Sequence, residues 1–259
     1  MLPVTADAGE PPRCPVCDAT CVPLGAVEFN KCCEELRGTR LPTSGRLIEY
    51  VICPGCDFSF APEFQAWTLT DFEREIYNED YVRVDPDAAD VRPRMYANSL
   101  IAAFGEQGRA ITHLDYGGGA GLLSELLRQA GWQSTSWDPF FDRGVDPKKL
   151  GTFQLITCFE VFEHVPDAGQ LAKTLASLLA TDGLLMFSTQ VSDGQLATGQ
   201  PLTWWYASPR NGHISLFSMK SLGGLAQRHG LKFASNSPGT HVFFRTRFPA
   251  WARPLLQGG

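Results

Sequence analysis

From residue 111 onward, the chain alternates short apolar runs with amphipathic segments. Runs rich in leucine, aromatic and β-branched residues predict strands, and segments whose apolar positions recur at helical spacing predict helices. The predicted strands cover 111–116, 132–138, 153–159, 184–190, 231–237 and 240–246, and the predicted helices cover 120–131, 168–183 and 220–229. Strands that alternate with helices predict a mostly parallel sheet covered on both faces. The last two strands are expected to pair antiparallel across a Ser-Pro-Gly turn at 237–239.

The first part of the chain has a different pattern. Residues 14–63 hold seven of the eight cysteines, with short strand-like runs such as Leu47–Cys53. An aromatic and acidic stretch follows, and an amphipathic helix is expected over Arg92–Gln107. We therefore expect a cysteine-rich domain over 1–63, a connector with a pocket helix over 64–110, an α/β core over 111–247 with an insertion at about 191–217, and a tail over 248–259.

Composition narrows the class of protein. The 259 residues, of which 44% are hydrophobic, are enough for one α/β domain and a small appendage. A net charge of -6 without a basic stripe argues against nucleic-acid binding and fits a free or a protein-borne substrate better. No apolar run approaches the length of about 18 residues that a membrane span needs. The N-terminus lacks the features of a secretory signal, so we expect a cytoplasmic protein; the oligomeric state is left open.

The cysteines form two near copies of one motif. Without an export signal, metal binding is favoured over disulfides. Four thiolates in paired C-x-x-C motifs suit a tetrahedral structural Zn²⁺, which would supply folding energy to a unit too small to bury much core. The expected ligands are Cys14, Cys17, Cys53 and Cys56. Cys21, Cys32 and Cys33 are either ordinary thiols or, alternatively, a substitute ligand or part of a second metal site.

A glycine-rich loop, Asp115-Tyr-Gly-Gly-Gly-Ala-Gly121, lies between the first predicted strand and helix of the core. Its glycines do not fit the G-x-G-x-x-G dinucleotide pattern, and the lysine of a phosphate-binding P-loop is absent. Glycine allows the backbone to approach a ligand closely, because no Cβ intrudes. A carboxylate beside the loop suits a cationic amino-acid group better than a pyrophosphate.

The pattern D-x-G-x-G-x-G resembles motif I of the class I S-adenosylmethionine-dependent methyltransferases. Three further markers follow in the order of that family: Asp138 after the next strand, the segment 157–167 with its E-V-x-E-H sequence, and the turn into a strand at 181–189. The resemblance implies a Rossmann-like methyltransferase fold with a mostly parallel sheet, an antiparallel last strand and, here, a small zinc ribbon-like domain before it. It also implies S-adenosyl-L-methionine as cofactor.

The resemblance further implies which residues contact the cofactor. Glycines of the loop would wrap its methionine part, and Asp138 would accept its ribose hydroxyls. Only 14 residues separate Asp138 from Phe153, so the family's third strand is expected to be shortened or lost, with Phe140 or Phe141 against the adenine instead. The full expected set is Asp115, Tyr116, Gly117, Gly119, Gly121, Asp138, Pro139, Phe140, Phe159, Glu160, Tyr81 and Arg94.

Candidates for the chemistry lie in two segments. Glu163 and His164 follow the strand at 153–159, and similar clusters in ubiquinone-pathway O-methyltransferases are associated with a divalent metal. The aromatic insertion carries His213, with Arg210 as a second polar group. Because histidine titrates near neutral pH, His213 is a candidate general base. Alternatively, it is a hydrogen-bonding strut, and His164 takes the role of the base.

We therefore expect methyl transfer from S-adenosyl-L-methionine to a small molecule, a sugar or a biosynthetic intermediate. The layout of a C-x-x-C…C-x-x-C module before such a core resembles some sugar C-methyltransferases, without fixing the substrate or the acceptor atom. The alternative is a catalytically silent cofactor-binding module whose zinc domain holds a partner protein.

Overall fold

The computed structural model describes residues 10–256, so parts of the predicted segments 1–63 and 248–259 lie outside the described residues. Six strands form the larger sheet in the order β5-β4-β6-β7-β10-β9. Strands β5, β4, β6 and β7 run parallel, whereas β10 is antiparallel to β7 and to β9. The bounds are β4 Thr112–Tyr116, β5 Gln133–Trp137, β6 Phe153–Cys158, β7 Leu179–Ser188, β9 Lys232–Ser237 and β10 Thr240–Phe244. The predicted mostly parallel sheet with an antiparallel last strand is confirmed.

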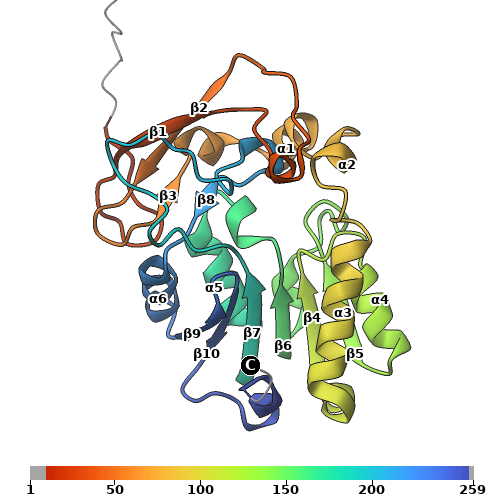
Figure 1. Cartoon of the computed structure of the whole chain (residues 1–259). Coiled ribbons are helices and arrows are strands. Elements are labelled where there is room, and N and C mark those ends of the chain that lie inside the picture. The colour runs from red at the N-terminus through yellow and green to blue at the C-terminus, as the bar shows by residue number, and fades with distance from the viewer. Residues whose placement is uncertain (1–9, 257–259) are drawn as a thin grey trace, which may run out of the picture.

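Helices cover both faces of this sheet (Figure 1). Leu155 of β6 packs with α3, Val91–Phe104, and α4, Leu122–Gln129. Its neighbour Ile156 packs with α5, Ala168–Leu178, and α6, Met219–Arg228. Successive strand residues point to opposite faces, and both side chains are fully buried. This explains why the central strands read as continuous apolar runs rather than as an alternating pattern.

Two details of the core concern where its strands and helices begin and end. Between Asp138 and Phe153 the structure has a short 3-10 turn, Pro147–Leu150, and no strand, so β5 is an edge of the sheet and the expected loss of a third strand is confirmed. Helix α5 ends at Leu178, five residues before the predicted end at Gly183. Leu179 pairs with Phe153 of β6, so strand pairing takes residues whose local pattern still favours a helix.

A second, four-stranded sheet lies above the carboxyl ends of β6 and β7 (Figure 1). Its order is β1-β2-β3-β8, with β1 Val22–Glu28, β2 Leu47–Ile52, β3 Ser59–Phe60 and β8 Ser215–Leu216. Three strands come from the cysteine-rich region, and β8 comes from the predicted insertion at 191–217. The N-terminal unit therefore completes its sheet with a strand from the core, and the division of the chain at residue 63 stays a prediction.

The connector consists of α1, Leu69–Glu75, and α2, Tyr81–Val84, before α3. Helix α1 begins with a capping box, in which the Thr68 hydroxyl accepts from the Asp71 N–H and the Asp71 carboxylate accepts from the Thr68 N–H. Aromatic residues of the insertion, Trp204 and Tyr206, join the apolar cluster of the small sheet. Within residues 10–256, no helix has the length and apolar character needed to cross a bilayer.

Candidate cofactor and acceptor site

The glycine loop turns from β4 into α4 at the carboxyl end of the sheet. Residues Gly117, Gly119 and Gly121 have φ angles of 76°, 55° and 81°, which favour glycine. The Gly117 N–H donates to the Trp137 carbonyl at 2.8 Å, and a Cβ at Gly117 would lie 2.4 Å from Val161. A Cβ at Gly119 would have no heavy atom within 4 Å. Gly119 therefore presents bare backbone to open space, whereas Gly117 serves close packing.

The Asp138 carboxylate joins this loop to the turn after β5. One oxygen accepts from the Gly119 N–H at 3.0 Å, and the other accepts from the Phe140 N–H at 2.8 Å. Asp138 is 7% exposed, so its charge lies in a protected position beside the open face of Gly119. Pro139 and Phe140, which follow it, are half-buried.

Asp115 takes a different position from the one that its spacing suggested. Its carboxylate is 4% exposed and lies beneath the loop, since a Cβ at Gly118 would be 2.4 Å from the Asp115 Oδ2 atom. Burial raises the pKa of Asp115 to about 7, against a hydrogen bond from Thr157 that lowers it. Asp115 thus supports the loop from below and does not face the open side of Gly119. Tyr116, the next residue, is also covered and packs on Trp137.

A chain of buried hydrogen bonds holds Asp115 in this position. The Thr157 hydroxyl donates to Asp115 at 2.8 Å and lies 3.0 Å from His113 Nε2. The other ring nitrogen, Nδ1, lies 2.7 Å from the Ser134 hydroxyl, which is 2.8 Å from the Ser124 hydroxyl. Burial lowers the pKa of His113 to about 3, so the ring is neutral. The neutral ring of His113 thus joins Ser134 of β5 to Thr157 of β6.

Aromatic rings gather near the ends of β5 and β6, since Phe140 follows β5 and Phe159 follows β6. Tyr96 stacks on Phe159 with a centroid distance of 4.1 Å. Tyr77 contacts the rings of Tyr81 and Phe140, each at 5.1 Å. Of these rings, Tyr81, Phe140 and Phe159 were expected at the cofactor, whereas Tyr96 was not, because spacing along the chain does not show that this side of α3 packs on the residues after β6.

Glu160, which follows β6, has a φ of 54°, an uncommon conformation for a residue with a side chain. Its N–H donates to the Ser188 hydroxyl at 2.8 Å, and its carboxylate accepts from the same hydroxyl at 2.6 Å. Tyr96 donates to that carboxylate at 3.3 Å. These bonds hold a strained residue between the ends of β6 and β7, as is common at functional sites.

Glu163, His164 and His213 come together from two distant segments. Their ligating atoms lie within 4.8 Å of one another. Tyr206 donates to Glu163 Oε1, whereas Glu163 Oε2 and His164 Nδ1 are buried without a hydrogen-bond partner among the described residues. Burial raises the pKa of Glu163 to about 8 and lowers that of His164 to about 4. The cluster is therefore uncharged at neutral pH and has unused polar atoms.

Gly212 makes this approach of the two histidines possible. Its φ is 89°, and a Cβ there would lie 2.9 Å from His164 Nδ1 and 3.1 Å from the Tyr77 hydroxyl oxygen. The rings of His164 and His213 are 5.0 Å apart, centroid to centroid. His213 Nδ1 lies 2.9 Å from the Tyr206 carbonyl, which accepts, so Nδ1 carries the proton and Nε2 has a free lone pair. The Gly212-His213 pair in the aromatic insertion was the sequence feature that marked His213 as a candidate.

Two arginines lie away from these groups. Arg94 is on the exposed side of α3, where it pairs with Asp90 at 2.8 Å. Arg210 is buried and donates to the Ile76 carbonyl at 2.6 Å and to Asn78 at 2.9 Å, so it fixes the connector to the insertion. The structure therefore does not bring Arg94 to the loop, and Arg210 is a structural link rather than a free polar group.

The two cysteine motifs form matching turns. In each, the N–H of the aspartate after the motif donates to the first cysteine's carbonyl at 2.8 Å, and the two aspartates have φ angles of 65° and 60°. The four sulfur atoms lie within 4.8 Å of one another, the closest pairs at 3.3 and 3.6 Å. A hydrogen bond from Cys56 lowers the pKa of the Cys14 thiol to about 5. The members are Cys14, Cys17, Cys53 and Cys56.

The extra cysteines of this region do not join the group of four. Burial raises the pKa of Cys21 and of Cys33 to about 12 in each case, so both are neutral thiols. Cys32 is buried as well. Cys33 differs in its location, because its sulfur lies 3.6 Å from His213 Nδ1.

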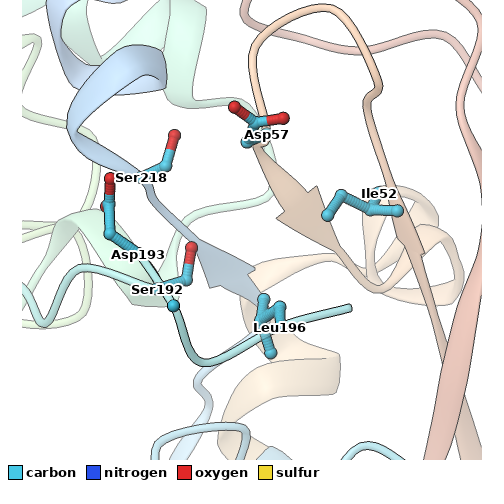
Figure 2. Close-up of a pocket in the computed structure, with 7 residues that line it drawn as sticks. Ile52, Asp57, Ser192, Asp193, Leu196 and Ser218 are labelled. Carbon is cyan, nitrogen blue, oxygen red and sulfur yellow. The ribbon is translucent and has the colours of Figure 1, made fainter. Parts of the chain in front are cut away.

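A cavity of about 200 Å³ lies beside the small sheet, away from the glycine loop. Figure 2 shows Ser192 and Asp193 from the insertion and Ser218 on one side, with Asp57 and Ile52 from the cysteine-rich region across from them. None of its lining residues is a predicted site residue. The Asp193 carboxylate already accepts from the Met219 N–H at 2.8 Å, which caps α6.

We predict that Thr157→Val lowers the free energy of unfolding by about 1–3 kcal/mol, because the buried Asp115 carboxylate loses its donor. The loss should be larger at pH 8 than at pH 5, since Asp115, with a pKa near 7, is ionised only at the higher pH. Urea unfolding at both pH values measures this. Thr174→Val, a buried threonine on α5, is the control and should show no such pH dependence. An equal loss at both pH values would contradict the role of Thr157.

Comparison with known proteins gives the family. The methyltransferase domain family matches residues 62–236. The ubiquinone biosynthesis O-methyltransferase of Colwellia psychrerythraea is 27% identical over 151 residues, 46% of this chain and 60% of that protein. That of Bordetella avium is 31% identical over 106 residues, which are 32% of this chain and 43% of that protein. This chain therefore spans less than two thirds of either relative.

An O-methyltransferase family protein from Burkholderia thailandensis aligns over 68% of this chain and 63% of that chain, with 14% identity and a TM-score of 0.48. Because the family match covers more than half of the residues, this chain belongs to the methyltransferase domain family.

Proposed function

We propose that this protein transfers a methyl group from S-adenosyl-L-methionine to a small-molecule acceptor. The observation that carries the proposal is the glycine loop, where Gly119 faces open space beside the Asp138 carboxylate. Ligands of open α/β sheets bind at the carboxyl ends of the strands, where this loop lies. Membership of the methyltransferase domain family supports the reaction, and relatives named for ubiquinone biosynthesis support a small acceptor.

The residues around the loop fit this cofactor. The bare backbone at Gly119 leaves room for a closely bound ligand, and Asp138 has a protected carboxylate for hydroxyl donors. Phe140 and the stacked pair Tyr96 and Phe159 provide apolar surface for a flat ring. When bound, the cofactor supplies a methyl group on a positively charged sulfur. Asp115 supports the loop from beneath and keeps Gly119 in place.

We propose that His213 is the general base. Its Nδ1–H donates to the Tyr206 carbonyl, so Nε2 has the lone pair that accepts the acceptor's proton. Burial lowers the pKa of His213 below its ordinary value, which keeps the ring neutral and ready to take a proton. Glu163 is protonated near neutral pH and orients the site through Tyr206. His164 is the second candidate for the base.

A divalent ion is the alternative use of the same side chains. The unpartnered Glu163 Oε2 and His164 Nδ1, with His213, provide one carboxylate and two imidazoles, a donor set that suits metals such as Zn²⁺ or Fe²⁺. Such an ion would polarise the acceptor oxygen. A reaction that uses the general base alone is insensitive to chelators, whereas a reaction that needs the ion is not.

Within the N-terminal unit, we propose that the four clustered cysteines bind one structural Zn²⁺. Zinc–sulfur bonds of about 2.3 Å place tetrahedral thiolates ~3.8 Å apart. The sulfur–sulfur distances of 3.3 and 3.6 Å fit this arrangement after a small expansion. A site closed by four thiolates leaves no position for a substrate, so the metal stabilises structure.

We predict that Asp138→Ala weakens S-adenosylmethionine binding by about 1–3 kcal/mol, because a charged acceptor of two hydroxyls is lost. Gly119→Val should be worse, since its side chain occupies the ligand's space. Isothermal titration calorimetry measures both. Gly144→Val is the matched control, because Gly144 also has a positive φ, of 80°, and no neighbour within 4 Å, but lies outside the loop. Wild-type protein that binds no cofactor would refute the proposed function.

We predict one zinc per chain in protein made with zinc supplied. Cys53→Ser should lose the metal and destabilise the N-terminal unit more than the cofactor site, because metal binding provides folding energy there. Elemental analysis and thermal unfolding measure these effects. Cys21→Ser, which alters a buried cysteine outside the group of four, should retain the zinc. Less than about half an equivalent in the wild type would contradict the site.

We predict that His213→Ala lowers turnover by about 10²–10⁴ and leaves cofactor affinity nearly unchanged, because a general base acts only in the chemical step. Because burial lowers the pKa of His213 well below 6.5, wild-type turnover should fall only when the pH drops well below 6.5 and the ring takes up a proton, and the variant should lose this dependence. Acceptors are found by mass spectrometry of metabolite extracts incubated with labelled cofactor. His229→Ala is the control.

Two outcomes would redirect this assignment. Turnover that chelators abolish, and that added divalent ions restore, would favour the metal. Near-normal turnover of a folded His213→Ala variant would move the base to His164 or indicate that the acceptor needs alignment alone.

A further inference from the structure

Side chains of the cysteine-rich unit hold the segment that carries His213. The Tyr50 hydroxyl donates to the His213 carbonyl at 2.7 Å. Lys31 Nζ donates to the Trp204 carbonyl at 2.5 Å and to the Ala207 carbonyl at 2.9 Å. These contacts join residues more than 160 positions apart in the sequence.

The same segment is held through the backbone. The Cys33 N–H donates to the Asn211 side-chain carbonyl at 2.8 Å, and the Ala61 N–H donates to the Ile214 carbonyl at 2.9 Å. Strand β8 follows at once and pairs with β3. His213 therefore lies between two residues, Asn211 and Ile214, that accept hydrogen bonds from backbone N–H groups of the N-terminal unit.

The cysteine turns fix the elements that make these contacts. Tyr50 is on β2, and Cys53 follows that strand directly. The turn from Cys53 to Cys56 leads into β3, so a metal held at this turn would fix β2 and β3 relative to one another. The Ser218 hydroxyl donates to the Cys56 carbonyl at 2.9 Å, which attaches the far end of the His213 segment to the same turn.

The opposite side of the His213 segment contacts the loop of the core that follows β6. The Ile214 N–H donates to the Glu163 carbonyl at 2.9 Å, and the Ser215 hydroxyl donates to the Val165 carbonyl at 2.7 Å. The His213 segment is thus held between the loop after β6 and the cysteine-rich unit. If the contacts with the cysteine-rich unit loosen, the His213 ring can shift relative to Glu163 and His164.

Tyr50 and Lys31 are covered polar side chains whose acceptors lie in the insertion. Tyr50 is 1% exposed, and within residues 10–256 its hydroxyl has the His213 carbonyl as its hydrogen-bond partner. Lys31 is half-buried, and burial lowers the pKa of its ammonium group. Burying an ammonium is costly unless acceptors replace water, and here two carbonyls of the insertion provide that replacement.

We infer that Tyr50 and Lys31 are positioning residues for the reaction, which place His213 from the cysteine-rich unit and make that unit a part of the catalytic apparatus. The inference rests on the proposed function, in which His213 is the base. It gives the four-cysteine unit a role beyond stabilising its own fold: it fixes the geometry of the acceptor side. Small displacements of a reacting group can reduce a rate by about 10²-fold.

The test uses full-length Tyr50→Phe, which keeps the ring and removes the hydroxyl. We expect kcat to fall by about 10-fold or more, with the dissociation constant of the cofactor within about twofold of the wild type. In a His213→Ala background, the same change should have no further effect on kcat, because the residue acts through His213. Trp251→Phe, which removes one side-chain bond to the Asp182 carbonyl at the far end of the sheet, should leave kcat unchanged.

A second readout does not need turnover. Histidine-selective ¹⁵N NMR, with the His213 signal assigned from its absence in His213→Ala, follows the pKa and hydrogen bonding of the ring. Tyr50→Phe should raise the pKa of His213 toward its ordinary value, because a looser ring is less desolvated. The titratable and charged groups that face this ring are Cys33, Lys31, Arg92, Glu163, His164 and Tyr206.

The outcomes separate the inference from the proposed function. An unchanged His213 signal and unchanged kcat in Tyr50→Phe would overturn the inference while methylation persists. A fall in kcat that persists at the same size in the His213→Ala background would also overturn it. A wild type without any methyl transfer would refute the proposed function, and the NMR measurement would still test the positioning. If Tyr50→Phe does not fold, Lys31→Met provides the same comparisons.

Discussion

The pairing of β3 with β8 is the contact on which the rest of the site depends. Two residues of the cysteine-rich unit meet two residues that lie more than 150 positions later. Such a short ladder cannot be stable alone. It persists because Tyr50 and Lys31 satisfy buried carbonyls of the insertion and because apolar residues of both segments share one cluster. Through this contact, residues of the N-terminal unit and residues of the core pack together beside His213.

The second constraint is the burial of ionisable groups at the carboxyl ends of the parallel strands. Asp115, Glu163 and His164 have pKa values shifted by burial toward their neutral forms. Neutral groups avoid the cost of buried charge, and each still offers a defined donor or acceptor. His113 is also neutral and has a supporting role. Its ring joins two strands and keeps Asp115 beneath the loop. The site is thus organised by hydrogen bonds rather than by ion pairs.

Much of the core could be predicted from the sequence, because its signals are local. Apolar runs identified β4 to β7, and the short distance from Asp138 to Phe153 indicated the lost strand. The glycine loop was located from its D-x-G-x-G-x-G pattern, and its φ angles are ones that favour glycine. Arg94 shows the limit of this reasoning: its position before the core suggested a cofactor contact, yet the rotation of α3 directs it to Asp90. Periodicity alone did not settle which side of that helix faces the pocket, since its apolar pattern is weak.

By itself, the sequence determined the parallel α/β core, the cofactor-type loop and the pairing of two cysteine motifs, all of which depend on residues close together in the chain. Only the tertiary structure decided that β8 completes the small sheet, that Asp115 lies under the loop, and that Glu163, His164 and His213 meet. Contacts of this kind join segments separated by tens to hundreds of residues. They form because buried carbonyls, hydroxyls and apolar faces must all find partners at once, a condition that the local pattern of residues does not express.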